Sequence, residues 1–292
     1  MNNQKIILPD EWVAKISRLS IATSSKLRGQ HKGGNRSQRF GSSLDFSDFR
    51  EYTLGDDVRQ VDWNVYARTE KYFIKRFLDE QEMRVHILLD ATRSMGEDKK
   101  WLFARQIASA IGLMVLNRDD RLSFSYVGEM SALPFRKKGA TYRKHFLQIV
   151  SRLEEAGGKG SFAREGIKVL PKDSTVLFVI TDGLEPIAEW EQFFKRLPRF
   201  AGDIRCIQIR TENEINPSYT GDIRLIDAET NRDVNVSVSN RVLTGYEKTK
   251  ELHETEFDAL VNRFGIRKIQ LIVEDGLQNA IFHKLLKSHW VQ

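Results

Sequence analysis

The chain has 292 residues, of which 40% are hydrophobic and 29% charged, and it carries a formal net charge of +6 and one cysteine. This balance is globular rather than disordered, and the length suffices for one large domain or two modest ones. A single cysteine excludes an internal disulfide, and a net charge spread among 40 acidic residues argues only weakly for nucleic-acid binding.

The N-terminal part has neither a membrane span nor a secretion signal in its sequence. No stretch approaches the roughly 18–20 apolar residues of a span, and residues 1–18 lack an apolar run before a cleavage site. We therefore expect a cytoplasmic protein. The spacing of Trp12, Ile16 and Leu19 predicts a helix over residues 11–28. The basic, glycine-containing stretch at 26–39 predicts a solvated loop, with phosphate binding as the alternative.

Beyond this loop, residues 41–82 are rich in aromatic and charged side chains, with strands predicted at 61–65 and 71–77. From residue 84 the pattern alternates between strand and helix, which is typical of a parallel sheet covered by helices. Strands are predicted at 85–89, 121–127, 131–135, 175–180, 203–209 and 268–273. Helices are predicted at 99–116, 142–154, after Ser161, and at 186–197, 249–264 and 278–286. Cys206 falls inside a predicted strand and is expected to be a small core residue.

This pattern predicts an α/β fold with three parts. Residues 1–32 form an N-terminal helix and the basic loop. Residues 33–82 form a block of arginines, aspartates and aromatic residues that packs on the core. Residues 83–292 form a doubly wound, mostly parallel sheet flanked by helices, with a hairpin insertion at about 222–237.

Oxygen-bearing side chains follow two of the buried strands and a glycine-rich turn. They are Asp90, Thr92, Ser94, Ser161 and Asp182. Because ligands bind at the carboxyl ends of parallel strands, we expect these oxygens to converge. Two carboxylates and three hydroxyls suit Mg²⁺ or Mn²⁺ and leave the ion able to accept an outside carboxylate. The alternative is a site without metal, in which the two aspartates bind only loop amides.

These residues carry a resemblance to a known site. The pattern Asp-x-Thr-x-Ser at 90–94, followed by Ser161 and Asp182, resembles the metal ion-dependent adhesion site of von Willebrand factor type A domains. That site has Asp-x-Ser-x-Ser, then Thr, then Asp, so Thr92 and Ser161 keep the hydroxyl group. The resemblance implies a type A-like fold with an N-terminal β-rich extension, in which hydroxyls ligate the ion and a protein partner is bound without catalysis.

The upstream block is dense in charged residues that alternate with aromatic ones. Its charged members are Arg50, Glu51, Asp56, Asp57, Arg59, Asp62 and Arg68, and Glu80 follows. We predict a network of Arg–carboxylate pairs that clamps the block to the sheet, and we expect Arg59 to face a buried carboxylate. The alternative is a partner-binding or second ionic site.

The same block, with the later segment at 227–230, resembles the bacterial domain of unknown function family 58 over roughly residues 33–290. This resemblance implies an adaptor or co-chaperone of a MoxR-type AAA+ ATPase.

Other functions fit the sequence less well. A haloacid dehalogenase-type phosphohydrolase needs a second aspartate two residues after the nucleophile, where this chain has Thr92. Nucleic-acid binding through the loop at 26–39 would show a steep dependence on salt. The six histidines have no zinc-site spacing. A basic run at 136–138 is expected to be a solvated turn near the metal site. We therefore predict a non-enzymatic, metal-dependent protein-interaction module.

Overall fold

The computed structural model describes most of the chain, namely residues 7–23, 46–77, 82–96, 98–128, 135–153, 156–157, 160–217, 221–226 and 233–292. The basic loop at 26–39, Glu80 and the segment at 227–230 lie outside these residues. The chain divides into two compact units. The larger comprises Met1–Lys26 and Met83–Gln292, and the smaller comprises Leu27–Glu82.

A six-stranded sheet forms the centre of the larger unit, in the order β10-β7-β6-β3-β4-β5. The strands are β3 (Arg84–Asp90), β4 (Arg121–Val127), β5 (Phe135–Lys138), β6 (Ser174–Thr181), β7 (Ala201–Arg210) and β10 (Arg267–Ile272). Neighbouring strands are parallel except for the antiparallel edge pair β4 and β5. Chain order reverses between β3 and β6, so the topological switch point lies between their carboxyl ends.

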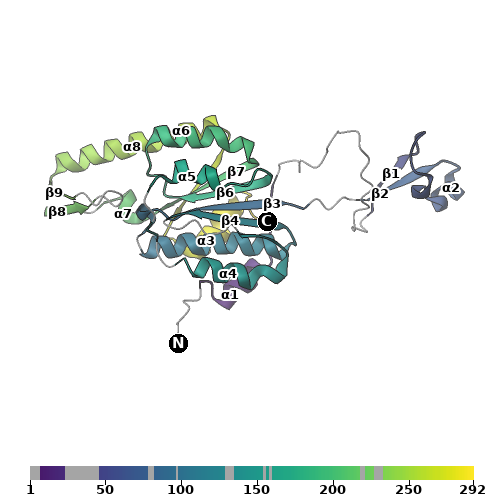
Figure 1. Ribbon diagram of the computed structural model, residues 1–292, viewed down its shortest axis with the longest axis horizontal. Coiled ribbons are helices and arrows are strands. Elements are labelled where there is room, and N and C mark those ends of the chain that lie inside the picture. Colours follow the sequence, from purple (N-terminus) through teal and green to yellow (C-terminus); the bar gives the residue numbers. More distant parts are fainter. Residues whose placement is uncertain are drawn as a thin grey trace. The chain divides into compact units, whose positions relative to one another are not determined.

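Helices cover both faces of this sheet (Figure 1). One layer contains α1 (Asp10–Ile16), α3 (Asp98–Asn117) and α4 (Arg143–Ser151). The other contains α5 (Phe162–Val169), α6 (Ile187–Arg196) and α8 (Asn240–Arg263). Two short helices follow the last strands: α7 (Glu212–Ile215), and α9 (Gly276–Asn279), which continues as a π-helix over Ala280–Leu285. This three-layer arrangement confirms the predicted α/β fold.

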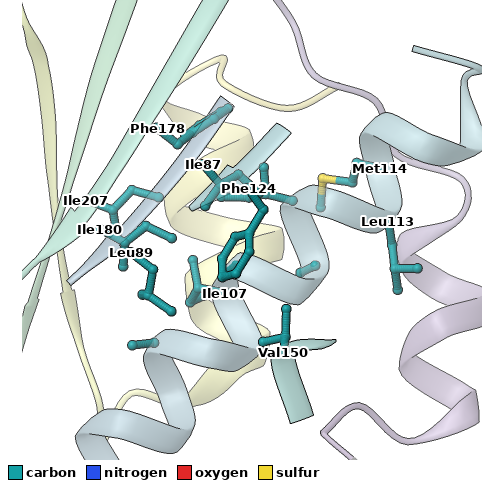
Figure 2. Close-up of a cluster of buried hydrophobic side chains, with 14 of the residues drawn as sticks. Ile87, Leu89, Ile107, Leu113, Met114, Phe124, Val150, Phe178, Ile180 and Ile207 are labelled. Atoms are coloured by element: carbon teal, nitrogen blue, oxygen red, sulfur yellow. The ribbon is translucent and has the colours of Figure 1, made fainter. Parts of the chain in front are cut away.

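The central strands are apolar on both faces because a helical layer covers each face. In β3, Ile87 and Leu89 pack with the layer that contains α3, whereas Leu88 packs with α5 and α6. Figure 2 shows the first of these clusters, where strand side chains meet Ile107 of α3. Cys206 is buried in β7, and burial raises the pKa of its thiol to about 12, which confirms it as an unreactive core residue.

The smaller unit contains an antiparallel pair, β1 (Phe46–Glu51) and β2 (Phe73–Phe77), with helix α2 (Trp63–Thr69) between them in sequence. Strand β2 confirms the strand predicted at 71–77. The strand predicted at 61–65 is wrong, because only Val61 makes a bridge, to Ile74. The next residue, Asp62, instead caps α2 by accepting hydrogen bonds from two backbone N–H groups of its first turn.

Three other boundaries differ from the predictions. Helix α1 ends at Ile16 and not near residue 28, because Ile21 forms an antiparallel bridge with Val291. The edge strand predicted to end at residue 135 continues to Lys138 as β5, and residues 131–134 of the prediction lie outside the described residues. Helix α8 begins nine residues before the predicted start at 249, at Asn240, where Ser239 caps it. The predicted hairpin is present as β8 (Gly221–Ile226) and β9 (Asp233–Val238).

Candidate functional site

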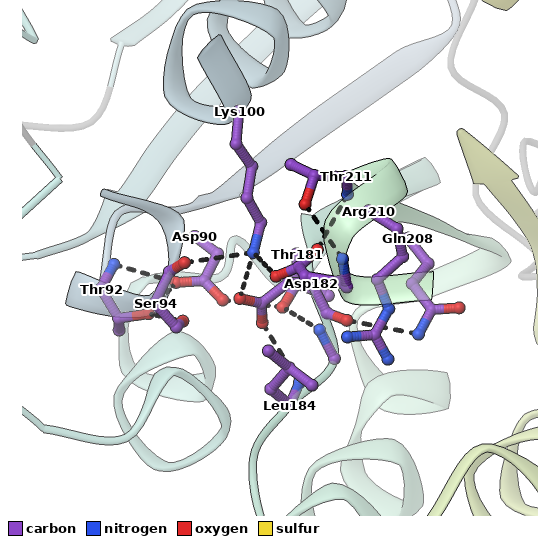
Figure 3. Close-up of polar contacts among 12 residues, drawn as sticks. Asp90, Thr92, Ser94, Lys100, Thr181, Asp182, Leu184, Gln208, Arg210 and Thr211 are labelled. Atoms are coloured by element: carbon purple, nitrogen blue, oxygen red, sulfur yellow. Dashed lines mark hydrogen bonds and ion pairs between the residues drawn. The ribbon is translucent and has the colours of Figure 1, made fainter. Parts of the chain in front are cut away.

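The carboxyl end of β3 delivers the first group of predicted oxygens (Figure 3). Asp90 is the last residue of the strand and only 1% exposed. Its Oδ1 accepts hydrogen bonds from the Thr92 N–H at 3.0 Å and the Thr92 hydroxyl at 2.6 Å. Its Oδ2 accepts from the hydroxyl of Thr181, the last residue of β6, at 2.7 Å. The Ser94 hydroxyl lies 3.2 Å from the Thr92 hydroxyl, so the alternating residues of this loop turn their oxygens together.

The carboxyl end of β6 delivers the second carboxylate to the same cluster. Asp182 is also 1% exposed, and its Oδ1 accepts from the Leu184 N–H at 3.1 Å. The Asp182 carboxylate also interacts with the Ser94 hydroxyl, and its negative charge repels the carboxylate of Asp90. Four of the five predicted residues are therefore brought together at the switch point, as strand order requires.

Sequence reasoning missed a buried cation in this cluster. Lys100 of α3 is fully buried, and its Nζ donates to Asp182 Oδ2 at 2.9 Å, Glu214 Oε1 at 2.7 Å and the Ser94 carbonyl at 3.1 Å. Figure 3 shows this side chain reaching from the helix to Asp182. A signal was present in the sequence, because position 100 lies three, four and seven residues before the apolar positions 103, 104 and 107 of α3, and so shares their face.

The two aspartates have opposite electrostatic environments. Burial, followed by repulsion from Asp182, raises the pKa of Asp90 to about 7, and its hydrogen bonds only partly oppose this. Burial also acts to raise the pKa of Asp182, but the charge and hydrogen bond of Lys100 outweigh it, so the pKa lies below its ordinary value. For Lys100, attraction to Asp182 and Glu214 outweighs burial and raises the pKa. Lys100 and Asp182 are therefore both ionised at neutral pH.

Ser161 is held in a different set of hydrogen bonds. It caps α5, the helix predicted after Ser161, by accepting from the Arg164 N–H at 3.1 Å. Its hydroxyl donates to Glu185 Oε2 at 2.9 Å, and the Glu185 carboxylate also accepts from the first N–H groups of the helix. Within the described residues, Ser161 makes no hydrogen bond to the other four predicted ligands. Glu185 also escaped sequence reasoning, although it follows Asp182 by only three residues.

The charged residues of the smaller unit act mainly as local caps. Arg50 pairs with Asp56 at 2.9 Å, while Asp57 and Asp62 cap the short helix at Val58–Gln60 and helix α2. Arg68 donates to the Asn64 carbonyl at 3.2 Å, and Glu51 is exposed.

Arg59 does not match the expectation of a buried pair. Its side chain is exposed and forms no ion pair with the residues that the structure describes. Phe49 and Trp63 are also exposed within this unit, by 42% and 57%. In the smaller unit taken by itself, Arg59 therefore does not face a buried carboxylate.

The basic run at 136–138 does not lie near the site. It belongs to β5, where Lys138 pairs with Arg121 at the amino end of β4. Asp90 pairs with Val127 at the opposite end of that strand. This prediction is wrong because the run continues an antiparallel edge strand and carries its side chains away from the switch point.

Two general properties follow from the described part of the chain. It contains no group of three or more His, Cys, Asp or Glu side chains arranged to hold a metal ion, so an ion here would depend on hydroxyl ligands as well. It also contains no helix with the length and apolar character needed to cross a bilayer.

Solved structures with partial similarity have low identity and low TM-scores. BatB from Bacteroides thetaiotaomicron is 12% identical, with 70% of this chain and 98% of that chain covered and a TM-score of 0.39. The VWA domain of SpRpn10 is 12% identical, with coverages of 69% and 94% and a TM-score of 0.38.

Sequence relatives and a family model also match the chain. Uncharacterized proteins of Mycobacterium tuberculosis and Mycobacterium bovis are 24% identical over 183 residues, which cover 60% of this chain. The match spans 58% of the length of these relatives. Residues 48–256 match the model of the family described as "Protein of unknown function DUF58", which confirms the resemblance of the upstream block and sheet. The chain belongs to this DUF58 family.

Proposed function

We propose that the chain is a non-enzymatic protein-interaction module whose binding site is the carboxyl edge of the main sheet around Asp90. A divalent cation, Mg²⁺ or Mn²⁺, takes part in binding, and the partner is a MoxR-type AAA+ ATPase. The cytoplasmic location of this complex stays a prediction from the sequence. The observation that carries the proposal is the convergence of Asp90, Thr92 and Ser94 beside Asp182 at the switch point.

The residues at this point fit a hard cation. Asp90, Thr92, Ser94 and Asp182 all offer oxygens, which is the donor type that Mg²⁺ and Mn²⁺ prefer, although the Lys100 ammonium group also reaches Asp182. The Asp90 carboxylate is buried, and its described hydrogen-bond donors are hydroxyls and a backbone amide, with no cation among them. A buried carboxylate without a cation is costly, and its raised pKa expresses that cost.

Asp90, Thr92, Ser94 and Asp182 would hold the ion, and Ser161 would join them only by releasing Glu185. When bound, the ion would supply a Lewis-acidic position for a carboxylate of the partner. This chemistry needs no nucleophile from the chain. It also accords with Thr92, which hydrogen-bonds Asp90 where a phosphohydrolase of the haloacid dehalogenase type would need an acid.

A pull-down with a purified MoxR-type AAA+ ATPase tests this function. We expect the wild-type protein to retain the ATPase in Mg²⁺ and to lose it in EDTA, and Asp90→Asn to lose it in both buffers. The matched control is Asp173→Asn, which changes an exposed carboxylate paired with Arg84 at the amino end of β3. Equal retention in Mg²⁺ and EDTA would contradict the metal requirement, and no retention in either buffer would contradict the partner.

A further inference from the structure

Lys100 is an unusual residue to find in the core of a cation-binding edge. Its side chain is 1% exposed, and a lysine is almost never buried without a partner. Two carboxylates and one carbonyl surround its ammonium group, and each accepts a hydrogen bond from it. The ammonium group therefore supplies, next to Asp182 and Glu214, the positive charge that a bound metal ion would otherwise supply.

The position of this charge is fixed from two sides. Lys100 extends from α3, a helix of 20 residues packed in the core. Its partner Glu214 belongs to α7, where a capping box with Thr211 fixes the carboxylate: Oε2 accepts from the Thr211 N–H at 2.9 Å while Oε1 accepts from Lys100. Lys100 therefore cannot leave Asp182 without also breaking the contact between α3 and α7.

An ammonium group bonded to a carboxylate takes up one of its lone pairs and repels a divalent ion that would bind beside it. Asp182 Oδ1 is occupied by the Leu184 N–H and Oδ2 by Lys100, whereas Asp90 has no cationic partner among the described residues. We infer that Lys100 is a built-in competitor for the cation: it occupies Asp182, weakens the binding of a divalent ion, and leaves Asp90 as the main carboxylate ligand. This inference rests on the proposed metal-binding function.

A charge-matched variant separates competition from net charge. Asp90, Asp182, Glu214 and Lys100 together carry a formal charge of −2 when all are ionised. The double variant Lys100→Met/Glu214→Gln keeps that total, because it removes one positive and one negative charge, but it frees Asp182. Replacing Glu214 as well leaves one fewer carboxylate without a cation than Lys100→Met alone would, which limits the loss of stability.

The test is isothermal calorimetry with MnCl₂ on wild type, Lys100→Met/Glu214→Gln and Glu214→Gln, with circular dichroism to show that each variant is folded. We expect the double variant to bind Mn²⁺ at least about tenfold more tightly than wild type, a gain of roughly 1.4 kcal/mol. Glu214→Gln alone leaves Lys100 on Asp182, so it should bind no more tightly than wild type. If this double variant does not fold, Lys100→Gln/Glu214→Gln, which keeps the same total charge and retains hydrogen-bond donors at position 100, takes its place with the same expectation.

The outcomes distinguish this inference from the proposed function. Equal Mn²⁺ affinity in wild type and double variant would overturn the competition and leave the metal-binding function standing. Binding by the double variant alone would support the competition and overturn metal dependence in the natural protein. Absence of binding in both would overturn both.

Discussion

Replacement of Arg205 by methionine tests a second buried ion pair of the larger unit. The guanidinium group pairs with Asp203 at 2.7 Å and donates to the backbone carbonyls of Trp290 and Ala22. It also lies against two neighbouring rings, 5.2 Å from the centroid of Phe178 and 5.6 Å from that of Trp290. Methionine keeps an apolar chain against these rings and removes the charge and its five donors.

The expected loss follows from what Arg205 leaves behind. Removing one partner of a buried pair costs about 3–5 kcal/mol. The half-exposed Arg267, whose guanidinium is 2.6 Å from Asp203, still compensates that carboxylate, which places the loss near the lower limit. Two carbonyls also lose a donor, which offsets part of this compensation. We therefore expect Arg205→Met to lower the free energy of unfolding by about 3 kcal/mol.

Urea unfolding followed by circular dichroism measures this loss, and the unfolding midpoint should move to lower urea. The matched control is Arg263→Met, because Arg263 and its partner Glu191 are both exposed, and the expected change is below about 1 kcal/mol. A loss below about 1 kcal/mol for Arg205→Met as well would refute the idea that burial makes this pair important.

Acidification gives a second measurement on the same pair. Burial acts to raise the pKa of Asp203, but hydrogen bonds from Arg205 and Arg267 outweigh it, so the pKa in the folded protein lies below its ordinary value. Such a group stabilises the fold above its unfolded pKa, and the stabilisation is lost as pH falls through the folded value. Asp203→Asn should therefore narrow the stability difference between pH 7 and acidic pH, and an unchanged difference would contradict this.

Three further predictions concern other sites. Gly112→Ala should destabilise the protein by about 1–3 kcal/mol despite the higher helix propensity of alanine, because the new Cβ would lie 2.0 Å from a ring carbon of Phe146. Gly245 lies on an open stretch of α8, so Gly245→Ala should stabilise the protein by up to about 1 kcal/mol. Urea unfolding of both variants measures these changes. Arg59→Ala should change the melting temperature little, since its side chain is exposed, and a loss of several degrees would reveal a partner. Asp90 has a pKa raised to about 7, so this carboxyl group lowers the stability of the fold as pH rises from about 4 to 7. In EDTA, Asp90→Asn should therefore raise the melting temperature at pH 8 and not at pH 4. An equal change in melting temperature at the two pH values would refute this.

The sheet and half of the site were predictable because their signals are local. Continuous apolar runs such as 85–89 and 175–180 indicate strands covered on both faces, and the oxygens after them must meet at one edge. Asp90 and Asp182 could therefore be placed together without coordinates. The helix Trp63–Thr69 was missed because its aromatic and β-branched residues favour a strand, while the cap at Asp62 that decides the matter is a single residue.

The remaining part of the site depends on contacts between distant segments. Lys100 and Glu214 are 114 residues apart, and no local pattern connects them. The bond between Ser161 and Glu185 likewise depends on how α5 meets the loop after β6. The sequence pattern predicts which side-chain oxygens belong to the site. It does not show which of these oxygens already form hydrogen bonds or ion pairs with other parts of the protein.

The two aspartates of the motif are therefore physically unlike, although the sequence presents them as a pair. Lys100 neutralises Asp182 and, through Glu214, connects that aspartate to α7, so its charge contributes to the stability of the fold itself. Within the described part of the chain, Asp90 receives only hydroxyl and amide donors, so its ionised form remains costly unless a cation arrives from outside. Lys100 pairs with Asp182, whereas Asp90 has no such pair among the described residues, so cation binding at this edge should depend mainly on Asp90. A substitution of Asp182 should first change the stability of the fold.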